Sequence, residues 1–237
     1  MPSLPFLHSP LFNDASLVSY YQLENTSDSK GANTLTNTGS ATFTPAKFNN
    51  GANLGTSNSG TYLHAATNMG ITGGAITLCG WIKILTEPGA NAQYYLAVCS
   101  SSTNNIGNFI GYQDTSGTKS VFVDRSKGGI GEQIASFNVD LGTTNFHHLA
   151  YAYDGSTVNL YVDGINVAQV SASGNGASGY SDLFTLGASF VPNAYASAIY
   201  DDWQVFSRVL TATEIFSLYV SHRSISGASS ISSPMFY

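Results

Sequence analysis

Between residues 145 and 170, apolar and polar side chains alternate with a period of two. One set of alternate positions holds Phe146, His148, Ala150 and Ala152, and the opposite set holds His147, Leu149, Tyr151 and Tyr153. Asp-Gly pairs at 154–155 and 163–164 interrupt the alternation, and Asp-Gly between such runs is a strong signal for a hairpin turn. We therefore expect a three-stranded antiparallel meander here. Because a meander alone is only marginally stable, the rest of the chain should supply a second sheet.

The same alternation predicts short strands on both sides of this meander. They cover 17–23, 41–48, 52–54, 61–64, 75–85, 94–99, 108–113, 120–124, 132–138, 183–186 and 198–206, with residues 24–39 as a polar loop. Thr211 to Glu214 read as a capping box, and Ile215, Leu218 and Tyr219 follow at helical spacing. These patterns predict an all-β fold, an antiparallel β-sandwich with one short helix near the C-terminus.

Several segments carry a resemblance to a known family. They are FHHLAYAYDG at 146–155 with LYVDG at 160–164, LVSYY at 17–21, ITLCGWIK at 76–83, and DDWQVF at 201–206 with LTATEI at 210–215. In this order they resemble the laminin-G-like, concanavalin-A-like lectin and glucanase jelly rolls, although the family usually has Trp where this chain has Phe146. The resemblance covers residues 17–221 and implies a jelly-roll sandwich. It is weak evidence for function, because such a fold hosts many activities.

Domain organisation follows from the same boundaries. We expect an N-terminal arm at 1–16, one laminin-G-like domain at 17–221 and a C-terminal tail at 222–237. Each terminal segment could pack on its own sandwich or dock on a neighbouring subunit, since segments with apolar residues are tied down somewhere. A homo-oligomer therefore stays open.

Charge and hydropathy exclude some partners. Only 9% of residues are charged, the net charge is −6, and the eight basic residues are scattered, which argues against nucleic acid as a ligand. No apolar run approaches the length of a membrane span, so membrane insertion is not expected. Residues 1–7 lack a basic n-region and contain prolines, so no signal peptide is visible. The family is often extracellular, and a virion-associated protein also fits this start.

Catalytic motifs are weak. The glycine spacing at 174–179 matches a dinucleotide loop but lacks the following helix, so we interpret it as a turn. His147 and His148 are neighbours on a strand and cannot easily share a metal; we expect one inside the sandwich and one exposed. Glycoside hydrolysis needs two converging carboxylates, and the acidic residues here are isolated or, at Asp201 and Asp202, point to opposite faces. Cys79 and Cys99 are expected to be free thiols, with a cross-strand disulfide as the alternative.

A structural calcium ion is implied by the resemblance. Related jelly rolls often hold Ca²⁺ between the loop after the first strand and the acidic pair of the last long strand. The matching residues are Asp28 and Asp201, with oxygens near Asn33 completing the set, because calcium prefers six to eight oxygen ligands. The loop departs from the pattern at Lys30 and holds one carboxylate.

Aromatic side chains in or beside Gly-, Asn- and Ser-rich loops are candidates for ligand contacts, with strand packing as the alternative. They are Tyr94, Tyr95, Tyr112, Tyr180 and Tyr195. The preferred function is a non-catalytic lectin-like module that binds glycan or another cell-surface ligand. The alternative is a structural virion or surface-assembly protein, such as a phage decoration, fibre or tail component, whose arms contact other subunits. A glycoside hydrolase is the third hypothesis.

Overall fold

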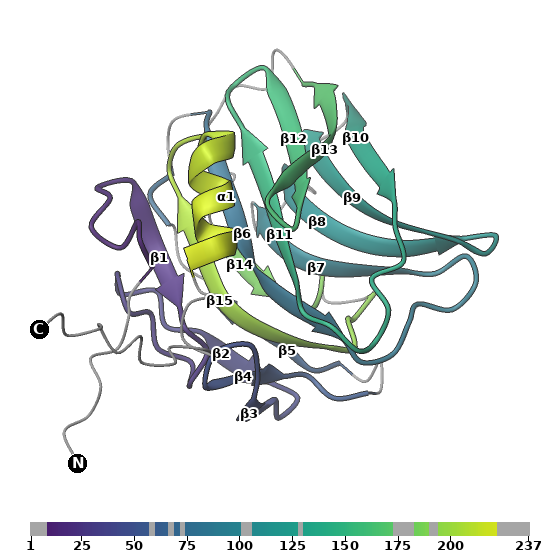
Figure 1. The fold of residues 1–237 in the computed structure, drawn as a ribbon, viewed down its shortest axis with the longest axis horizontal. Coiled ribbons are helices and arrows are strands. Elements are labelled where there is room, and N and C mark those ends of the chain that lie inside the picture. The colour runs from purple at the N-terminus through teal and green to yellow at the C-terminus, as the bar shows by residue number, and fades with distance from the viewer. Residues whose placement is uncertain are drawn as a thin grey trace, which may run out of the picture.

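Two antiparallel sheets stack face to face in the computed structural model (Figure 1). The structure describes residues 9–56, 60–65, 69–71, 74–100, 106–127, 130–172, 183–189 and 194–221. The predicted antiparallel β-sandwich with one helix near the C-terminus is confirmed.

The first sheet, called sheet A, has eight strands in the order β13-β12-β11-β6-β15-β4-β3, and β1 pairs with β15 beside this path. Its strands are β1 (Leu17–Tyr21), β3 (Thr42–Pro45), β4 (Asn50–Asn53), β6 (Ile76–Ile84), β11 (His147–Tyr153), β12 (Thr157–Val162), β13 (Ile165–Ser171) and β15 (Ala198–Phe206). The expected meander is β11-β12-β13 at one edge of this sheet.

The second sheet, sheet B, has seven strands in the order β10-β9-β8-β7-β14-β5-β2. Its strands are β2 (Thr36–Thr38), β5 (Tyr62–Ala65), β7 (Gln93–Ser100), β8 (Ile106–Thr115), β9 (Thr118–Lys127), β10 (Ile130–Asn138) and β14 (Leu183–Leu186). The sequence pattern missed β2, which lies in the segment expected to be a loop. Its residues are polar and mostly exposed, so they show no alternation, and pairing with β5 is what makes them a strand.

Alternate residues of β11 enter two different cores. Leu149, Tyr151 and Tyr153 belong to the large apolar cluster between the sheets. Ala150 and Ala152 belong to a smaller cluster on the outer face of sheet A, which α1 (Ala212–Ser221) covers with Ile215 and Leu218 (Figure 1). The two-residue period thus assigns each side chain to the sandwich interior or to the helix-covered face.

The helix begins with the predicted capping box. The main-chain N–H of Thr211 donates to Oε2 of Glu214 at 2.8 Å, and the N–H of Glu214 donates to the Thr211 hydroxyl at 3.3 Å. These reciprocal bonds satisfy two amides that have no partner inside the helix. Sheet A therefore gains a cover at a defined position, which also places Tyr219 beside β6 and β11.

Residues 9–16, within the predicted N-terminal arm, pack on the sandwich of their own chain. The Ser9 hydroxyl donates to the buried side chain of Gln204 at 2.7 Å, and Leu11 and Phe12 pack against the outer cluster. Arg208 bonds Asp14 and Glu214, each at 2.6 Å, and so joins this segment to the helix. The boundaries of the arm, the domain and the tail stay predictions, because residues 1–8 and 222–237 lie outside the described ranges.

Both cysteines are buried free thiols, as expected. Cys79 lies on β6 in the outer cluster, and Cys99 lies on β7 in the cluster between the sheets. Within the described ranges, α1 is too short to cross a membrane, and no longer apolar helix is present.

Candidate ligand-binding pocket

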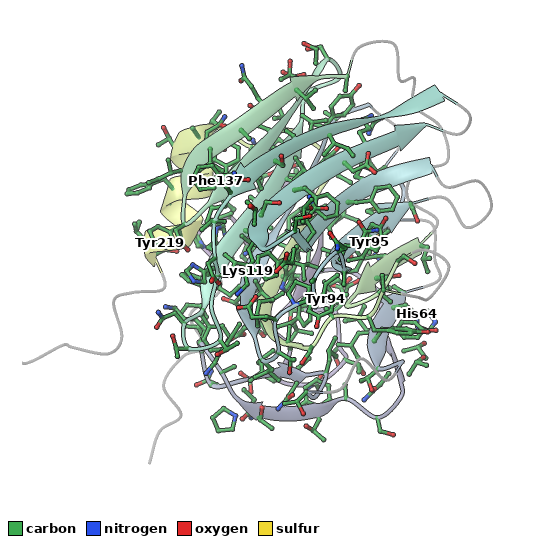
Figure 2. The ribbon with its side chains drawn as sticks, turned by 90° about the vertical axis from the view of Figure 1, so that its right-hand side faces the viewer. His64, Tyr94, Tyr95, Lys119, Phe137 and Tyr219 are labelled. Carbon is green, nitrogen blue, oxygen red and sulfur yellow. The ribbon has the colours of Figure 1, made fainter. Side chains whose placement is uncertain are left out.

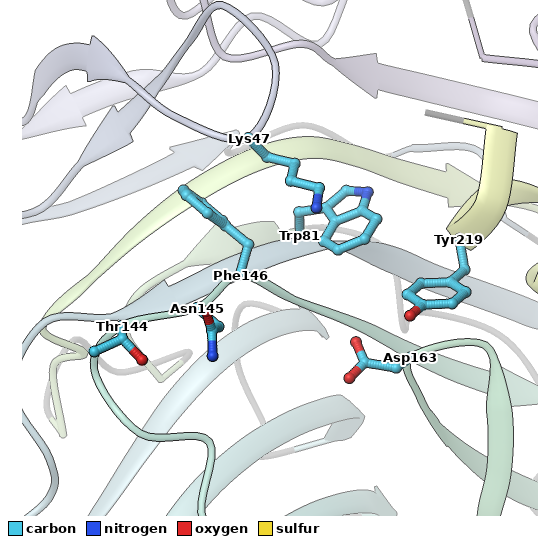
Figure 3. A pocket seen from close by; sticks show the side chains of 7 residues that line it. All are labelled: Lys47, Trp81, Thr144, Asn145, Phe146, Asp163 and Tyr219. Atoms are coloured by element: carbon cyan, nitrogen blue, oxygen red, sulfur yellow. The ribbon is translucent and has the colours of Figure 1, made fainter. Parts of the chain in front are cut away.

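A pocket of about 430 Å³ opens beside the outer face of sheet A (Figure 3). The residues that line it are Lys47, Trp81, Thr144, Asn145, Phe146, Asp163 and Tyr219. They come from five places: the turn after β3, strand β6, the loop between β10 and β11, the β12–β13 turn, and α1. Its size lies in the range of small-molecule sites, and it combines aromatic rings with groups that donate and accept hydrogen bonds.

The β12–β13 turn carries Asp163 to the pocket. Asp163 and Gly164 have φ values of 51° and 79°, the left-handed pair that a tight hairpin turn of this kind requires. A Cβ at residue 164 would lie 3.0 Å from ring atoms of both Phe216 and Tyr219. Glycine therefore allows the turn and also lets α1 approach it closely, which brings Tyr219 and Asp163 to the same pocket.

Trp81 forms an aromatic wall and is only 2% exposed. The ring of Tyr219 stacks on it with centroids 5.6 Å apart, and Nζ of Lys47 lies 4.2 Å from its centroid. The main-chain carbonyl of Trp81 accepts a hydrogen bond from Nε1 of Trp203 at 2.9 Å. Packing on several sides holds the indole in one orientation, so this wall is preformed.

His147 ties the pocket loop to the meander. Its Nδ1 lies 2.9 Å from Oδ2 of Asp163, and its Nε2 lies 3.0 Å from the carbonyl of Leu141. The hydrogen bond to Asp163 raises the pKa of His147, against a smaller lowering by burial. Burial raises the pKa of Asp163, but bonds from the His147 ring and the His148 amide outweigh it and leave that pKa below its ordinary value.

The histidine pair is split between two environments. His148 is buried, but it lies on the outer face of sheet A against Trp81 and Tyr219, not inside the sandwich. His147 is partly exposed at the rim. The expectation of one ring inside the sandwich is corrected because α1, which is distant in sequence, buries the outer face.

Tyr94 and Tyr112 are not surface platforms. Both rings belong to the cluster between the sheets, and Tyr112 is 0% exposed. The Tyr112 hydroxyl instead donates to Asp140 at 3.3 Å and accepts the N–H of Leu141 at 3.2 Å. Tyr112 therefore anchors the pocket loop from inside the sandwich, a role that its position in a strand did not indicate.

Tyr95 and Tyr195 are half-buried and lie away from the pocket. Tyr95 contacts Phe109 and Phe122 edge to face at 5.8 and 6.2 Å, and Figure 2 shows it on the side of sheet B. Tyr195 stacks on Tyr62 at 6.1 Å. Tyr180, like the glycine-rich segment 174–179, lies outside the described residues. The candidate tyrosines thus do not meet at one site, and their role as ligand contacts stays a prediction.

The residues proposed for calcium are engaged with the protein itself. Asp28 accepts main-chain N–H bonds from Tyr20, Lys30 and Asn33 at 2.9, 3.0 and 3.2 Å. The side-chain amide of Asn33 donates to the Ser19 hydroxyl at 2.8 Å. The three N–H donors satisfy the Asp28 carboxylate, which thereby holds the loop after β1 in shape. This is the turn-capping role that Asp commonly has.

Asp201 has a different environment. It is 0% exposed, and its Oδ2 accepts the N–H of Phe48 at 2.7 Å, while its Oδ1 has no hydrogen-bond partner. Burial, with the charge of Asp202, raises its pKa to about 9. The described residues contain no group of three or more His, Cys, Asp or Glu side chains that could hold a metal ion. These contacts fit a calcium ion poorly, and calcium stays a prediction.

Sequence reasoning singled out none of the pocket residues as ligand contacts. Trp81, Phe146 and Asp163 were identified as carriers of the family resemblance, Phe146 also by its place in the alternation and Asp163 as a turn residue, and Tyr219 was identified only as a helix residue. Lys47 was placed in a strand, but it follows β3, which ends at Pro45. One available signal was the polar run before residue 146, because loops that follow strands in a sandwich often carry binding residues.

Comparison with known proteins bears on the fold. The model of the concanavalin A-like lectin/glucanases superfamily, in its laminin G type, matches residues 54–216. A comparison with curated protein sequences gives no significant match.

Solved structures with a similar fold include the binding domain of botulinum neurotoxin DC in complex with SialylT, at 18% identity and a TM-score of 0.70 over 89% of this chain and 52% of that one. The same domain in complex with rat synaptotagmin II matches at 16% and 0.69 over 87% and 52%. A botulinum neurotoxin type C structure, described as dependent on two ganglioside molecules for cell entry, matches at 16% and 0.70 over 87% and 51%. The chain thus spans about half the length of these chains, and the likeness concerns the fold.

Proposed function

Because the chain belongs to the concanavalin A-like lectin and glucanase superfamily, we propose that it is a non-catalytic module that binds a glycan at the pocket beside Trp81. The ligand is a carbohydrate of a cell surface, and the module acts outside the cell. Two of the structures with a similar fold are described as binding domains in complex with SialylT and with rat synaptotagmin II, and a third is described by a cell entry that depends on two ganglioside molecules, which supports a surface ligand.

The observation that carries this proposal is the lining of the pocket. The half-buried rings of Phe146 and Tyr219 supply apolar surface, against which the C–H faces of a sugar ring pack, and the buried Trp81 ring supports Tyr219 by stacking on it. Polar side chains around them include Asn145 and Thr144, which can bond sugar hydroxyls (Figure 3). A glycan needs both kinds of contact at once, and both are present here.

The same lining argues against hydrolysis at this pocket. Asp163 is the one carboxylate among the described residues that line it. Its two oxygens already accept bonds from the His147 ring and the His148 amide, each at 2.9 Å. Hydrolysis of a glycosidic bond generally uses two carboxyl groups placed on either side of that bond.

The alternative role in a virion or surface assembly has less support. It relied on terminal arms that contact neighbouring subunits. The described part of the first arm, residues 9–16, contacts its own sandwich through Ser9, Leu11 and Phe12. An assembly role would need contacts from residues other than 9–16.

The test is a glycan screen with the intact chain, followed by titration of the best glycan retained. We expect Asn145→Ala to weaken binding about five- to tenfold, the equivalent of one lost hydrogen bond. Thr143→Ala is the matched control, because Thr143 is exposed in the same loop but is not among the residues that line the pocket.

Three outcomes separate the hypotheses. Loss of binding in Asn145→Ala with a normal Thr143→Ala supports the pocket. Loss only in Tyr95→Ala or Tyr195→Ala would keep glycan binding but move it to sheet B. A broad screen in which no glycan is retained would overturn the proposed function.

A further inference from the structure

The loop between β10 and β11 supplies part of the pocket lining and is held from two directions. From inside the sandwich, the Tyr112 hydroxyl accepts the N–H of Leu141. From the rim, the His147 ring meets the carbonyl of the same residue. Thr144, Asn145 and Phe146 lie between Leu141 and His147, so these contacts set where the pocket side chains stand.

Both ring nitrogens of His147 face atoms that can only accept a hydrogen bond. Nδ1 faces the Asp163 carboxylate at 2.9 Å, and Nε2 faces the Leu141 carbonyl at 3.0 Å. A neutral imidazole carries one N–H and therefore satisfies one of the two acceptors, whereas the imidazolium donates to both. Only the charged ring satisfies both contacts at once.

We propose that His147 is a positioning residue of the pocket, whose imidazolium fastens the 141–146 loop to the Asp163 turn, so that ligand affinity falls when the ring loses its proton. This inference rests on the proposed function, because it concerns the same pocket.

The two bonds break unequally. A bond to a carboxylate is stronger than a bond to a neutral carbonyl, so a neutral His147 keeps Nδ1–H for Asp163. Its Nε2 then presents a lone pair to the Leu141 carbonyl, which repels it. Deprotonation thus removes the attachment of the loop at the rim, while the bond from Leu141 to Tyr112 and the Asp163 turn stay in place.

Some charged and titratable neighbours of His147 raise its pKa and others lower it. Asp163, on the β12–β13 turn, favours the imidazolium and is the largest influence. Lys47, on the turn after β3, opposes it. His148 lies on the opposite face of β11, where its charge acts on Asp163. The raised pKa of His147 places the transition above the ordinary value of about 6.5.

The experiment has one readout that needs no ligand. Amide exchange of residues 141–146 in the intact chain is followed by NMR from about pH 6 to pH 9, together with the titration of the His147 ring. Rates are compared at each pH with those of His147→Gln, which removes the titrating group. We expect loop protection in the wild-type chain to drop about three- to tenfold as His147 deprotonates, and His147→Gln to show low protection without this step.

His64→Gln is the control, because His64 lies on β5 of sheet B and its pKa is lowered by burial. The His64→Gln variant should still lose loop protection as His147 deprotonates. The second readout is the affinity for the glycan from the screen, which should weaken over the same pH range in the wild-type chain and in His64→Gln but not in His147→Gln. Equal loop profiles in wild type and His147→Gln would overturn the inference. If loop protection falls as His147 deprotonates but no glycan binds, the role of His147 in holding the loop stands. Only the proposed glycan-binding function is then refuted.

Discussion

The indole of Trp203 lies directly over Gly80. A Cβ at residue 80 would stand 2.5 Å from both Cγ and Cδ2 of the ring. Trp203 is fully buried, and its Nε1 donates to the carbonyl of Trp81 at 2.9 Å, so the ring cannot move aside. Glycine at this position of β6 therefore lets the last long strand pack closely on the strand that carries the wall of the pocket.

Gly80→Ala should destabilise the fold by about 1–3 kcal/mol, the usual cost of overpacking a rigid core. The midpoint of urea unfolding measures this change. Gly89→Ala serves as the control, because nothing lies within 4 Å of a Cβ at that exposed position. Equal urea midpoints for the two variants would show that the Trp203 ring moves aside to accommodate the added methyl group.

The helix cap should matter for the outer face of sheet A. Thr211→Ala removes the hydroxyl that accepts the Glu214 amide, and we expect a loss of about 1 kcal/mol. Because α1 covers the cluster that contains Cys79, reaction of that thiol with a labelling reagent should also become faster. Thr213→Ala, at an exposed position in the first turn of the helix, should change neither quantity, and an effect of the same size there would contradict the capping argument.

Acid should weaken the attachment of residues 9–16. The bond from Arg208 lowers the pKa of Glu214 to about 2 and the pKa of Asp14 further still. Carboxyl groups with a depressed pKa stabilise the fold above their ordinary values, near 4, and this stabilisation is lost as the pH falls through the depressed ones. Unfolding followed from about pH 5 to pH 2 should thus show a steep loss of stability.

Arg208→Gln should flatten that pH dependence and lower stability at neutral pH by about 1–2 kcal/mol. Lys119→Gln is the comparison, since Lys119 lies 3.5 Å from Glu87 and 3.1 Å from the largely exposed Asp140, whereas both contacts of Arg208 are 2.6 Å, so its ion pairs should contribute less. If stability falls equally steeply with pH in the wild type and in Arg208→Gln, this ion-pair cluster is not the source of the pH dependence.

Asp201 should destabilise the fold at alkaline pH. Its pKa is raised to about 9, so the folded chain retains a proton that the unfolded chain releases near pH 4. Stability attributable to this group is therefore greatest below about pH 4 and falls as the pH rises toward 9. Asp201→Asn should remove that decline and raise the melting temperature at pH 8, with little change at pH 4.

The same variant also examines the calcium prediction. If Asp201 were a ligand, Asp201→Asn would lower stability at pH 8, and a chelator would lower the wild-type melting temperature but not that of the variant. If a chelator leaves the wild-type melting temperature unchanged, the prediction of a bound calcium ion is wrong.

Local patterns predicted most of the strands. The alternation at Leu149 and Ala150 assigned each side chain to its face of β11, and the Asp163-Gly164 pair located a turn. The capping box at Thr211 located the start of the helix. These signals succeed because the interactions behind them join residues two to four positions apart, so the sequence contains both partners.

The pocket depended on pairings that no local pattern contains. Lys47, Trp81, Asn145 and Tyr219 meet because β6 lies between β11 and β15 and because α1 folds back over the outer face. Tyr112 was a candidate ligand contact from its neighbouring loop residues, but it lies on β8 of sheet B and is buried in the cluster between the two sheets. The sequence by itself determined most of the strands, the two sets of side chains on opposite faces of the meander, and the family. Only the tertiary structure decided which loops meet, because the order of strands in a sheet is set by burial of the whole apolar surface, to which every segment contributes.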